Sequence, residues 1–495
     1  EDGERTGGLR GRVWTLDLVS GHSRNHPLTR RPQCADCGAG AGTREQQPLV
    51  LEPRPARFGA DGGLRIEPPA ATERRLARHV SPITGVVHDI VAVHTDAPIS
   101  CFAATHQQGA AVDFDSLRRM NRWASAGKGV SPAQARASAL CEALERYAGI
   151  FDGEEPRRRA RLDALGHEAI GPDELLLFSA RQYAARAEQP TRDPLKARWV
   201  PAPFDRQQPI SWTRAWSLTD GAFRYLPTAF CYYGFHDDDL APFCYADSNG
   251  NAAGNCVEEA ILQGLFELVE RDAVALWWYS RARRPALDLE RFDEPSALAL
   301  QRYYERRGGS MWVLDVTSDL GIAVFVAVAR DAQGRFALGM GAHVNARLAL
   351  TRAVSELGQV ASAFEATRAL PPELADDVFE RWHDQLEPRS QPQLLPDASA
   401  PPRTRADVPS TPDYGDLREG VLDCVERLRA RGLQMLVLEL TRPDIDLAVV
   451  KVVVPGLRHM WPRLAAGRLY DVPVALGWID EPLAEEALNP LPLII

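Results

Sequence analysis

The chain has 495 residues, of which 45% are hydrophobic and 25% are charged, and its formal net charge is −10. This apolar content is enough for a large buried core, which excludes an intrinsically disordered or fibrous chain. The acidic balance leaves no basic surface of the kind that binds nucleic acid, so we expect no nucleic-acid partner. We find no secretory signal peptide and no apolar run long enough to cross a bilayer, so we also expect no membrane partner and a cytoplasmic location.

The N-terminal segment, residues 1–74, is an extension rich in glycine, proline and arginine. Cys34 and Cys37 stand in a Cys-x2-Cys pair, which is half of a structural zinc site. A complete site needs four ligands, so either His22 and His26 or cysteines from a partner would have to close it. Two interpretations of this segment therefore stay open: it binds zinc, or it is a vestigial knuckle that no longer does.

Apolar runs alternate with helical patterns along the chain, which predicts a mixed α/β (α+β) fold. The runs predict strands at residues 12–19, 86–93, 311–316, 322–328, 435–440 and 447–454, and the helical periodicity predicts helices at about 132–151, 256–280, 346–367 and 416–431. Residues 383–412 are rich in proline, glutamine, serine and aspartate and are predicted to be a mobile loop.

One acidic pattern occurs on two of the predicted helices, at residues 139–146 and 264–271. In each copy two glutamates are three residues apart and an arginine follows the second, so all three side chains share one helix face. Magnesium takes oxygen ligands and is usually shared with a substrate phosphate. Two such faces could hold magnesium between them, which predicts an ATP site. The alternative is a pair of solvated helices with surface salt bridges.

Each of these helices has a narrow polar stripe on an otherwise apolar surface, which predicts that it is largely buried. A buried row of carboxylates is costly unless a metal or arginine neutralises it. The stripes consist of Gln134, Ser138, Glu142, Glu145 and Arg146 on the first helix, and of Glu259, Gln263, Glu267, Glu270 and Arg271 on the second.

Glycine-bearing segments, residues 126–129 and 249–255, precede the two helices. We interpret them as loops, because a glycine-rich approach to a helix N-terminus can cradle a phosphate. The glycine spacing and the Lys-Ser/Thr pair of a Walker A loop are absent. Lys128, one of three lysines in the chain, lies in the first segment and is a candidate nucleotide contact. It can equally be an ordinary loop residue.

Three runs of the chain resemble, in order, the three nucleotide motifs of the YcaO family. The matching residues are Ser138, Glu142, Glu145 and Arg146 in the first motif, Glu259 and Gln263 in the second, and Glu267 and Arg271 in the third. Ala252 stands where the second motif has serine, which puts one hydroxyl contact to the nucleotide in doubt. The resemblance covers most of residues 75–495 and implies a YcaO-like fold in which duplicated loop–helix units flank an ATP site.

The resemblance implies an azoline-forming cyclodehydratase of the D-protein type, from the biosynthesis of thiazole/oxazole-modified peptides. In such enzymes a Cys, Ser or Thr side chain of a ribosomally made precursor peptide attacks the preceding amide, and ATP phosphorylates the amide oxygen before it leaves. By resemblance, the magnesium ligands are Glu142, Glu145, Glu259, Glu267 and Glu270, and the nucleotide is held by Ser138, Arg146, Asn255, Gln263 and Arg271.

The last seven residues, 489–495, contain alternating prolines. They resemble a shortened form of the proline-rich tail that reaches the active site in azoline-forming members. Proline fixes an extended tail with little entropy left to lose, which suits a terminal carboxylate that acts as a base. Pro490, Pro492 and Ile495 are therefore candidate catalytic tail residues. The alternative is an apolar tail that only packs.

The N-terminal extension resembles the end of the ThiF-like partner domain that accompanies many YcaO cyclodehydratases, where a four-cysteine zinc site occurs. Only one cysteine pair is present here. The extension looks too short and glycine-rich to be a full peptide-recognition domain, so we expect a separate ThiF-like or leader-peptide-recognition partner protein. Family members are often dimers, so the resemblance also makes a homodimer plausible. Two alternatives stay open. One is thioamide formation, which exchanges oxygen for sulfur instead of removing water. The other is a non-catalytic scaffold that binds nucleotide or peptide, which the alanine at position 252 would favour.

Overall fold

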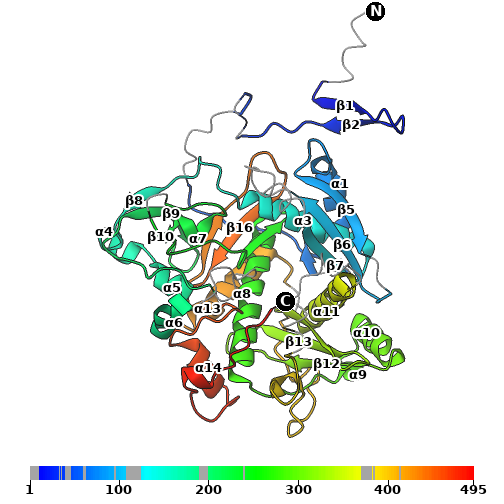
Figure 1. Cartoon of the computed structure of the whole chain (residues 1–495), viewed down its shortest axis with the longest axis vertical. Coiled ribbons are helices and arrows are strands. Elements are labelled where there is room, and N and C mark those ends of the chain that lie inside the picture. Colours follow the sequence, from blue (N-terminus) through cyan, green and yellow to red (C-terminus); the bar gives the residue numbers. More distant parts are fainter. Residues whose placement is uncertain are drawn as a thin grey trace, which may run out of the picture.

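The computed structural model describes residues 10–32, 34, 36–38, 46–59, 63–93, 96–106, 124–188, 199–237, 240–368, 382, 385–411 and 414–494. The predicted mixed α/β fold is confirmed, because helices accompany several antiparallel sheets (Figure 1).

A six-stranded antiparallel sheet lies at the centre of the molecule. Its strands follow the order β10 (Ala222–Pro227), β9 (Ile210–Ser217), β15 (Leu436–Glu439), β16 (Ala448–Val453) and β11 (Asn251–Gly254), and β8 (Arg158–Ala160) also pairs with β9. Helix α8 (Val257–Ser280) packs against β16 and β11 and runs through the middle of the molecule (Figure 1). The sheet therefore supports one of the two acidic helices directly.

Two smaller units share one plan, in which three antiparallel strands lead into a helix that packs on them. The first unit has β5 (Val87–Val93), β6 (Ser100–His106), β7 (Ala124–Gly129) and α3 (Pro132–Ala148), and the second has β12 (Ser310–Asp315), β13 (Ala323–Arg330), β14 (Phe336–His343) and α11 (Ala346–Arg368). The duplication seen in the sequence thus extends to a third helix, α11, which lacks the acidic pattern.

The segments predicted to be glycine-bearing loops are mostly strands, so that prediction is wrong. Residues 126–129 lie in β7, and residues 251–254 form β11. A Cβ atom added at Gly127 would lie 2.0 Å from the carbonyl oxygen of Ala135 in α3. The glycine is therefore required by close packing of a strand on a helix, and not by a flexible phosphate loop.

The long helices begin and end at recognisable signals. Ser131 caps α3, because its hydroxyl accepts the backbone N–H of Gln134 at 3.3 Å, and Pro132 occupies the first helical position. Glu258 and Glu259 lie in the first turn of α8, where their negative charges are attracted to the positive end of the helix dipole and stabilise the helix. This helix stops at Arg281, whose φ of 53° is left-handed.

The remaining elements surround these units. They are β1 (Arg12–Leu16), β2 (Ser23–Pro27), β3 (Arg57–Gly59), β4 (Gly63–Arg65), α1 (Pro69–Leu76), α4 (Leu162–Leu165), α5 (Pro172–Leu176), α6 (Ala180–Ala185), α7 (Thr228–Cys231), α9 (Leu289–Phe292), α10 (Pro295–Arg306), α13 (Leu417–Arg429) and α14 (Arg468–Ala475). Short 3₁₀ turns lie at Ala77–His79, Gly166–Glu168, Arg186–Glu188, Pro392–Leu394 and Glu485–Ala487. The hairpin β1–β2 lies at one edge of the molecule (Figure 1) and contacts the body through His26, whose Nδ1 is 2.8 Å from the hydroxyl of Ser81.

Helix α8 is the centre of the largest apolar cluster. Trp277, Trp278 and Tyr279 near its C-terminal end are almost completely buried, and the facing strands contribute valines. Its predicted burial on most sides is confirmed. Among the described residues no helix is both long and apolar enough to cross a bilayer.

Parts of the segment predicted to be a mobile loop pack against the body; it is described at residues 385–411. Leu394 is fully buried, and its carbonyl oxygen accepts the indole N–H of Trp312 at 2.9 Å. Gln391 is buried and accepts a hydrogen bond from Asn489 at 2.7 Å. Gln391 thus pairs with the C-terminal segment, whereas Asp397 and Asp407 pair with Ser399 and Thr404 inside the exposed part of the loop.

Candidate functional site

A cavity of about 530 Å³ lies between α3, α8 and α11. The eleven residues predicted from the sequence as nucleotide or magnesium contacts all line it, so the structure brings them together. They are Lys128, Ser138, Glu142, Glu145 and Arg146 from β7 and α3, and Asn255, Glu259, Gln263, Glu267, Glu270 and Arg271 from α8 and the residues before it.

On the α3 wall, one arginine holds both glutamates of the acidic pattern. Arg146 Nη1 donates to Glu145 Oε1 at 2.8 Å, and Arg146 Nη2 donates to Glu142 Oε1 at 3.4 Å. Arg146 Nη1 also donates to the hydroxyl of Tyr233 at 3.3 Å. The carboxylates and the guanidinium therefore face the cavity as one group.

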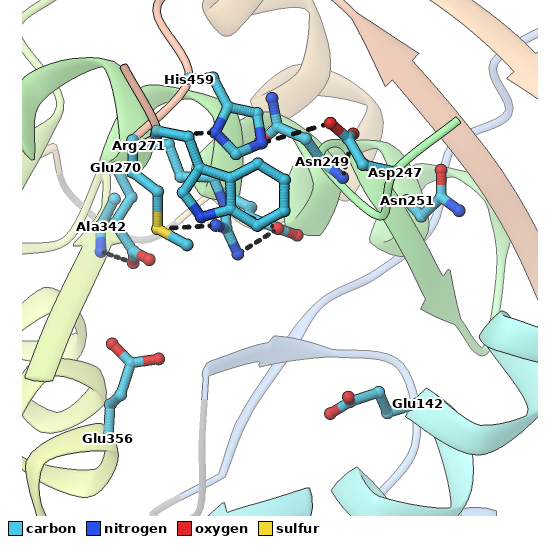
Figure 2. Close-up of polar contacts among 12 residues, drawn as sticks. Glu142, Asp247, Asn249, Asn251, Glu270, Arg271, Ala342, Glu356 and His459 are labelled. Atoms are coloured by element: carbon cyan, nitrogen blue, oxygen red, sulfur yellow. Dashed lines mark hydrogen bonds and ion pairs between the residues drawn. The ribbon is translucent and has the colours of Figure 1, made fainter. Parts of the chain in front are cut away.

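The α8 wall repeats this arrangement with different partners (Figure 2). Arg271 Nε donates to Glu267 Oε1 at 2.8 Å, and Arg271 Nη1 contacts the sulfur of Met460 at 3.0 Å. Glu270 points toward β14, where its Oε2 accepts the backbone N–H of Ala342 at 3.1 Å. The two faces predicted from the repeat thus meet across one cavity.

Glu259 and Gln263 already have hydrogen-bond partners in the cavity wall. Glu259 is 1% exposed, and its oxygens accept the backbone N–H groups of Ile66 at 2.6 Å and Asn255 at 2.9 Å. Gln263 Oε1 accepts from Arg352 at 2.9 Å. Glu259 already has backbone donors on both oxygens, so it orders the cavity wall as it stands.

Helix α11 supplies a third wall, which the sequence reasoning missed. Lys128 Nζ lies 2.6 Å from Glu356 Oε1, and Glu356 Oε2 accepts the backbone N–H of Met340 at 2.5 Å. Figure 2 shows Glu142 and Glu356 facing the same space from opposite sides. Arg352 and Gln359 also line the cavity. They stand four residues before and three after Glu356, so a polar stripe on this helix was the available signal.

The cavity raises the pKa of two of its carboxylates, Glu145 and Glu270, strongly. Burial raises the pKa of Glu145 to about 8; Arg146 opposes this shift, and Glu142 and Glu267 add to it. Burial, followed by the charge of Glu356, raises the pKa of Glu270 to about 7. For both carboxylates the cost of burial outweighs the attraction of the neighbouring cations, so both hold their protons more strongly than a solvated glutamate.

The donor set fits magnesium, because carboxylate oxygens from two walls converge on a deep polar space. As the described side chains stand, no group of three or more His, Cys, Asp or Glu residues is arranged to hold a metal ion. Several of the carboxylate oxygens accept hydrogen bonds from arginines or backbone N–H groups instead. Magnesium ligation would therefore require small side-chain rotations on the α3 and α8 walls.

Ala252 lies behind the site. It is 1% exposed, and a Cβ atom added at Gly264 of α8 would lie 3.4 Å from its own Cβ. It is not among the described residues that line the cavity. A serine at this position would lie under α8.

The C-terminal tail is packed into the core. The indole N–H groups of Trp278 and Trp382 donate to the backbone oxygens of Leu491 and Pro492, each at 2.7 Å. No described tail residue, Pro490 and Pro492 included, lines the cavity. Ile495 lies outside the described residues. The indole hydrogen bonds and apolar burial hold residues 491–494 in place.

The two histidines proposed to complete a zinc site do not do so. His26 is buried and uses both ring nitrogens, Nε2 toward Thr15 at 2.9 Å and Nδ1 toward Ser81 at 2.8 Å. His22 lies in the exposed hairpin β1–β2. Cys34 and Cys37 have no further metal ligands in the part of the chain that the structure describes. Because both ring nitrogens of His26 are hydrogen-bonded to hydroxyl groups, neither can coordinate zinc in this arrangement.

Comparisons with solved structures agree with this geometry. A heterocyclase solved in complex with substrate and cofactor is 43% identical with a TM-score of 0.91, and the match covers 98% of this chain and 64% of that one. The heterocyclase TruD is 41% identical with a TM-score of 0.78, and the match covers 98% of this chain and 61% of that one. This chain thus spans less than two thirds of either heterocyclase.

A more distant structure shares the fold. The YcaO protein of Methanopyrus kandleri, solved with AMPPCP and Mg²⁺, is 23% identical with a TM-score of 0.58, and the match covers 80% of this chain and 92% of that one. The YcaO cyclodehydratase family, described as ATP- and Mg²⁺-binding, matches residues 126–458. This match includes all three walls of the cavity and confirms the resemblance stated from the sequence. The chain belongs to the YcaO cyclodehydratase family.

Proposed function

We propose that this protein is an ATP-dependent cyclodehydratase that converts Cys, Ser or Thr residues of a ribosomal precursor peptide to thiazolines or oxazolines. The observation that carries the proposal is a single cavity in which the carboxylate–arginine groups of α3 and α8 face each other. It is supported by 43% identity over nearly the whole chain to a heterocyclase.

The roles of the cavity residues follow from their charges. Glu142, Glu145, Glu267 and Glu270 supply carboxylate oxygens for magnesium, and Glu259 fixes the wall and contributes an oxygen if Ile66 is displaced. Ser138, Asn255 and Gln263 supply polar contacts to the nucleotide. Lys128, Arg146, Arg271 and Arg352 supply positive charge for its phosphates.

The reaction requires that a poor leaving group, the amide oxygen, becomes a good one. When bound, ATP supplies the phosphoryl group for that oxygen and magnesium offsets the phosphate charge. The peptide's sulfur or hydroxyl oxygen forms a bond to the amide carbon and loses its proton. The amide oxygen leaves as part of inorganic phosphate, the amide nitrogen loses its proton, and the ring keeps a C=N bond.

The chain's own contribution is positioning and electrostatics. Arg146 and Arg271 are held by carboxylates that line the same space, so their positive charge is fixed before the phosphates arrive. Both helices are packed on sheets, α3 on β6 and β7 and α8 on β11 and β16, and this packing supports the cavity walls. Charge developing on the transferred group would meet fixed donors, which lowers the cost of reorganisation during the reaction.

The proposal includes recognition of the precursor's leader peptide. We propose that a ThiF-like or leader-peptide-recognition partner presents the precursor. The surface around Cys34 and Cys37 is the region proposed to face it, and zinc would require two ligands from that partner.

Glu145→Gln tests the proposal. The variant keeps the shape of the side chain but removes a metal-binding charge, so ATP consumption and magnesium-dependent binding of AMPPCP are expected to fall at least about 100-fold. Peptide mass spectrometry on the wild type with its partner is expected to show loss of one water for each ring.

The control is Glu426→Gln on the exposed face of α13, which should retain full activity. Unchanged ATP turnover in Glu145→Gln would contradict the proposed magnesium site. A mass gain from exchange of oxygen for sulfur would instead establish thioamide formation, and nucleotide binding without any change of peptide mass would establish a scaffold.

A further inference from the structure

Lys451 is a fully buried cation in an otherwise apolar strand. It lies in the middle of β16, whose other residues are alanine and valine, and it is 0% exposed. A buried ammonium group is costly unless other groups replace its hydration shell. The hydrogen bonds recorded for its Nζ all go to uncharged oxygens, so this lysine does not simply neutralise one adjacent carboxylate.

The oxygens belong to the turn that leads into β11 and to Asn251, the first residue of that strand. Lys451 Nζ donates to the backbone oxygens of Asp247 at 2.9 Å and Asn249 at 3.2 Å, and to Oδ1 of Asn251 at 3.1 Å. The ring of Phe230 lies beside it, with 5.1 Å between Nζ and the ring centroid. Three oxygens and an aromatic face replace water around the ammonium, and the ammonium in return fixes this turn.

One chain of contacts connects the turn to α3. Asn251 Nδ2 donates to the hydroxyl of Tyr233 at 2.8 Å, and Arg146 Nη1 donates to the same hydroxyl at 3.3 Å. Tyr233 thus accepts from both groups. The Asn251 amide is oriented because its oxygen is used by Lys451, so its nitrogen must point toward Tyr233.

A second chain of contacts connects the turn to α8 (Figure 2). Asp247 Oδ2 lies 3.3 Å from His459 Nε2, and His459 Nδ1 accepts the backbone N–H of Trp461 at 3.0 Å. Between these residues, Met460 places its sulfur 3.0 Å from Arg271 Nη1. The pairing of His459 therefore fixes the loop that holds Met460 against Arg271.

We propose that Lys451 is a positioning residue that aims Arg146 and Arg271 at one bound nucleotide. The inference rests on the proposed function, because it assumes that the cavity takes ATP. Both arginines line the cavity, whereas Lys451, Tyr233 and His459 are not among the residues that line it. Lys451 acts through the turn. Its ammonium group fixes the residues that hold Arg146 on α3 and Arg271 on α8.

A double-mutant cycle with Lys451→Met and Tyr233→Phe tests this inference. The affinity for AMPPCP with magnesium is measured by calorimetry for the wild type, the two single variants and the double variant. Each single change is expected to weaken binding about tenfold, and the double variant is expected to bind no more weakly than Lys451→Met alone. Non-additivity follows because both changes interrupt the same support of Arg146.

Thr213→Val is the matched control. It removes a buried hydrogen bond of 3.0 Å between Thr213 of β9, in the same six-stranded sheet, and Thr228 of α7, so it should lower thermal stability without changing nucleotide affinity. Should Lys451→Met not fold, Tyr233→Phe and His459→Phe carry the test, and each is then expected to weaken binding about tenfold while the melting temperature stays close to that of Thr213→Val.

The outcomes separate the two proposals. A wild type that binds no nucleotide overturns the proposed function and this inference with it. The inference alone is overturned if the wild type binds nucleotide and the folded Lys451→Met variant has an affinity within about twofold of the wild type. The inference is also overturned if the loss of affinity in the double variant equals the product of the losses in Lys451→Met and Tyr233→Phe.

Discussion

The same residue type has different roles in this cavity according to its neighbours. Glu356 lies against Lys128, and although burial opposes ionisation, the ammonium holds the pKa of Glu356 below its usual value. Burial instead raises the pKa of Glu145 to about 8. Glu356 is thus a permanent anion that fixes a lysine, whereas Glu145 gains charge when a cation arrives.

These shifts predict how stability depends on pH. The unfolded chain releases the Glu145 proton near the ordinary value of 4.5, whereas the folded chain keeps it to about pH 8. The folded state therefore binds more protons between these values, so the free energy of unfolding of the magnesium-free protein should fall as pH rises through this window. Thermal melting between about pH 5 and pH 8 measures the effect.

Magnesium with AMPPCP should reverse that trend, since both need the ionised carboxylates, and should stabilise the protein more at pH 8 than at pH 6. In Glu145→Gln the fall of stability with pH should be reduced, because this side chain no longer titrates. A melting temperature of the metal-free wild type that rises steadily across the range would contradict the assigned pKa direction.

At the scale of elements, close packing of strand on helix shapes the cavity walls. Gly127 lets β7 lie against α3, and Gly339 and Gly341 let β14 lie against α11, where an added Cβ would come within 2.0 to 2.2 Å of the helix backbone. The walls that carry Glu145 and Glu356 are therefore held at a spacing that larger residues would widen.

Gly127→Ala should push α3 away from β7, because the new methyl group meets backbone atoms that cannot rotate aside. The expected cost is about 3 kcal/mol of unfolding free energy, with weaker nucleotide binding as the α3 wall moves. Urea unfolding and AMPPCP titration measure the two effects. Gly415→Ala is the control, because nothing lies within 4 Å of its added Cβ, and it should change stability by less than about 0.5 kcal/mol.

At the scale of the whole molecule, the N-terminal extension is joined to the body by a buried polar cluster. Arg31 Nη1 lies 3.0 Å from Asp444 Oδ2, and the hydroxyl of Tyr147 donates to the same oxygen at 2.6 Å. The side chain of Asp444 is 1% exposed. Tyr147 belongs to α3, so the extension is connected to a helix of the candidate site.

The C-terminal tail is held by burial as well as by indole hydrogen bonds. Leu493→Ala should cost about 3 kcal/mol of unfolding free energy, because Leu493 is 0% exposed and its removal leaves a cavity in the largest apolar cluster. Leu422→Ala on α13 is the matched control, since Leu422 is 45% exposed and the change should cost less than about 0.5 kcal/mol. Equal denaturation midpoints for the two variants would show that the tail does not contribute to the core.

The sequence by itself determined the long helices, several strands and the eleven polar residues that meet in the cavity. Helical periodicity and the repeated Glu-x2-Glu-Arg pattern are local, so they can be read without knowing what faces them. Strands β9 and β10 were missed because arginine and aromatic residues break their apolar pattern, and β7 and β11 because their glycines resemble loop residues.

Only the tertiary structure decided which further groups join the site. Arg352 and Glu356 lie on a helix without the acidic pattern, so their place in the cavity depends on non-local packing. Lys451 does not line the cavity, and the role proposed for it depends on contacts with a turn about 200 residues earlier in the chain. The burial of the tail and the use of His26 by hydroxyl partners were likewise invisible in the sequence. Local spacing determines which side chains share a face, whereas burial and charge compensation are set by what the fold places opposite that face.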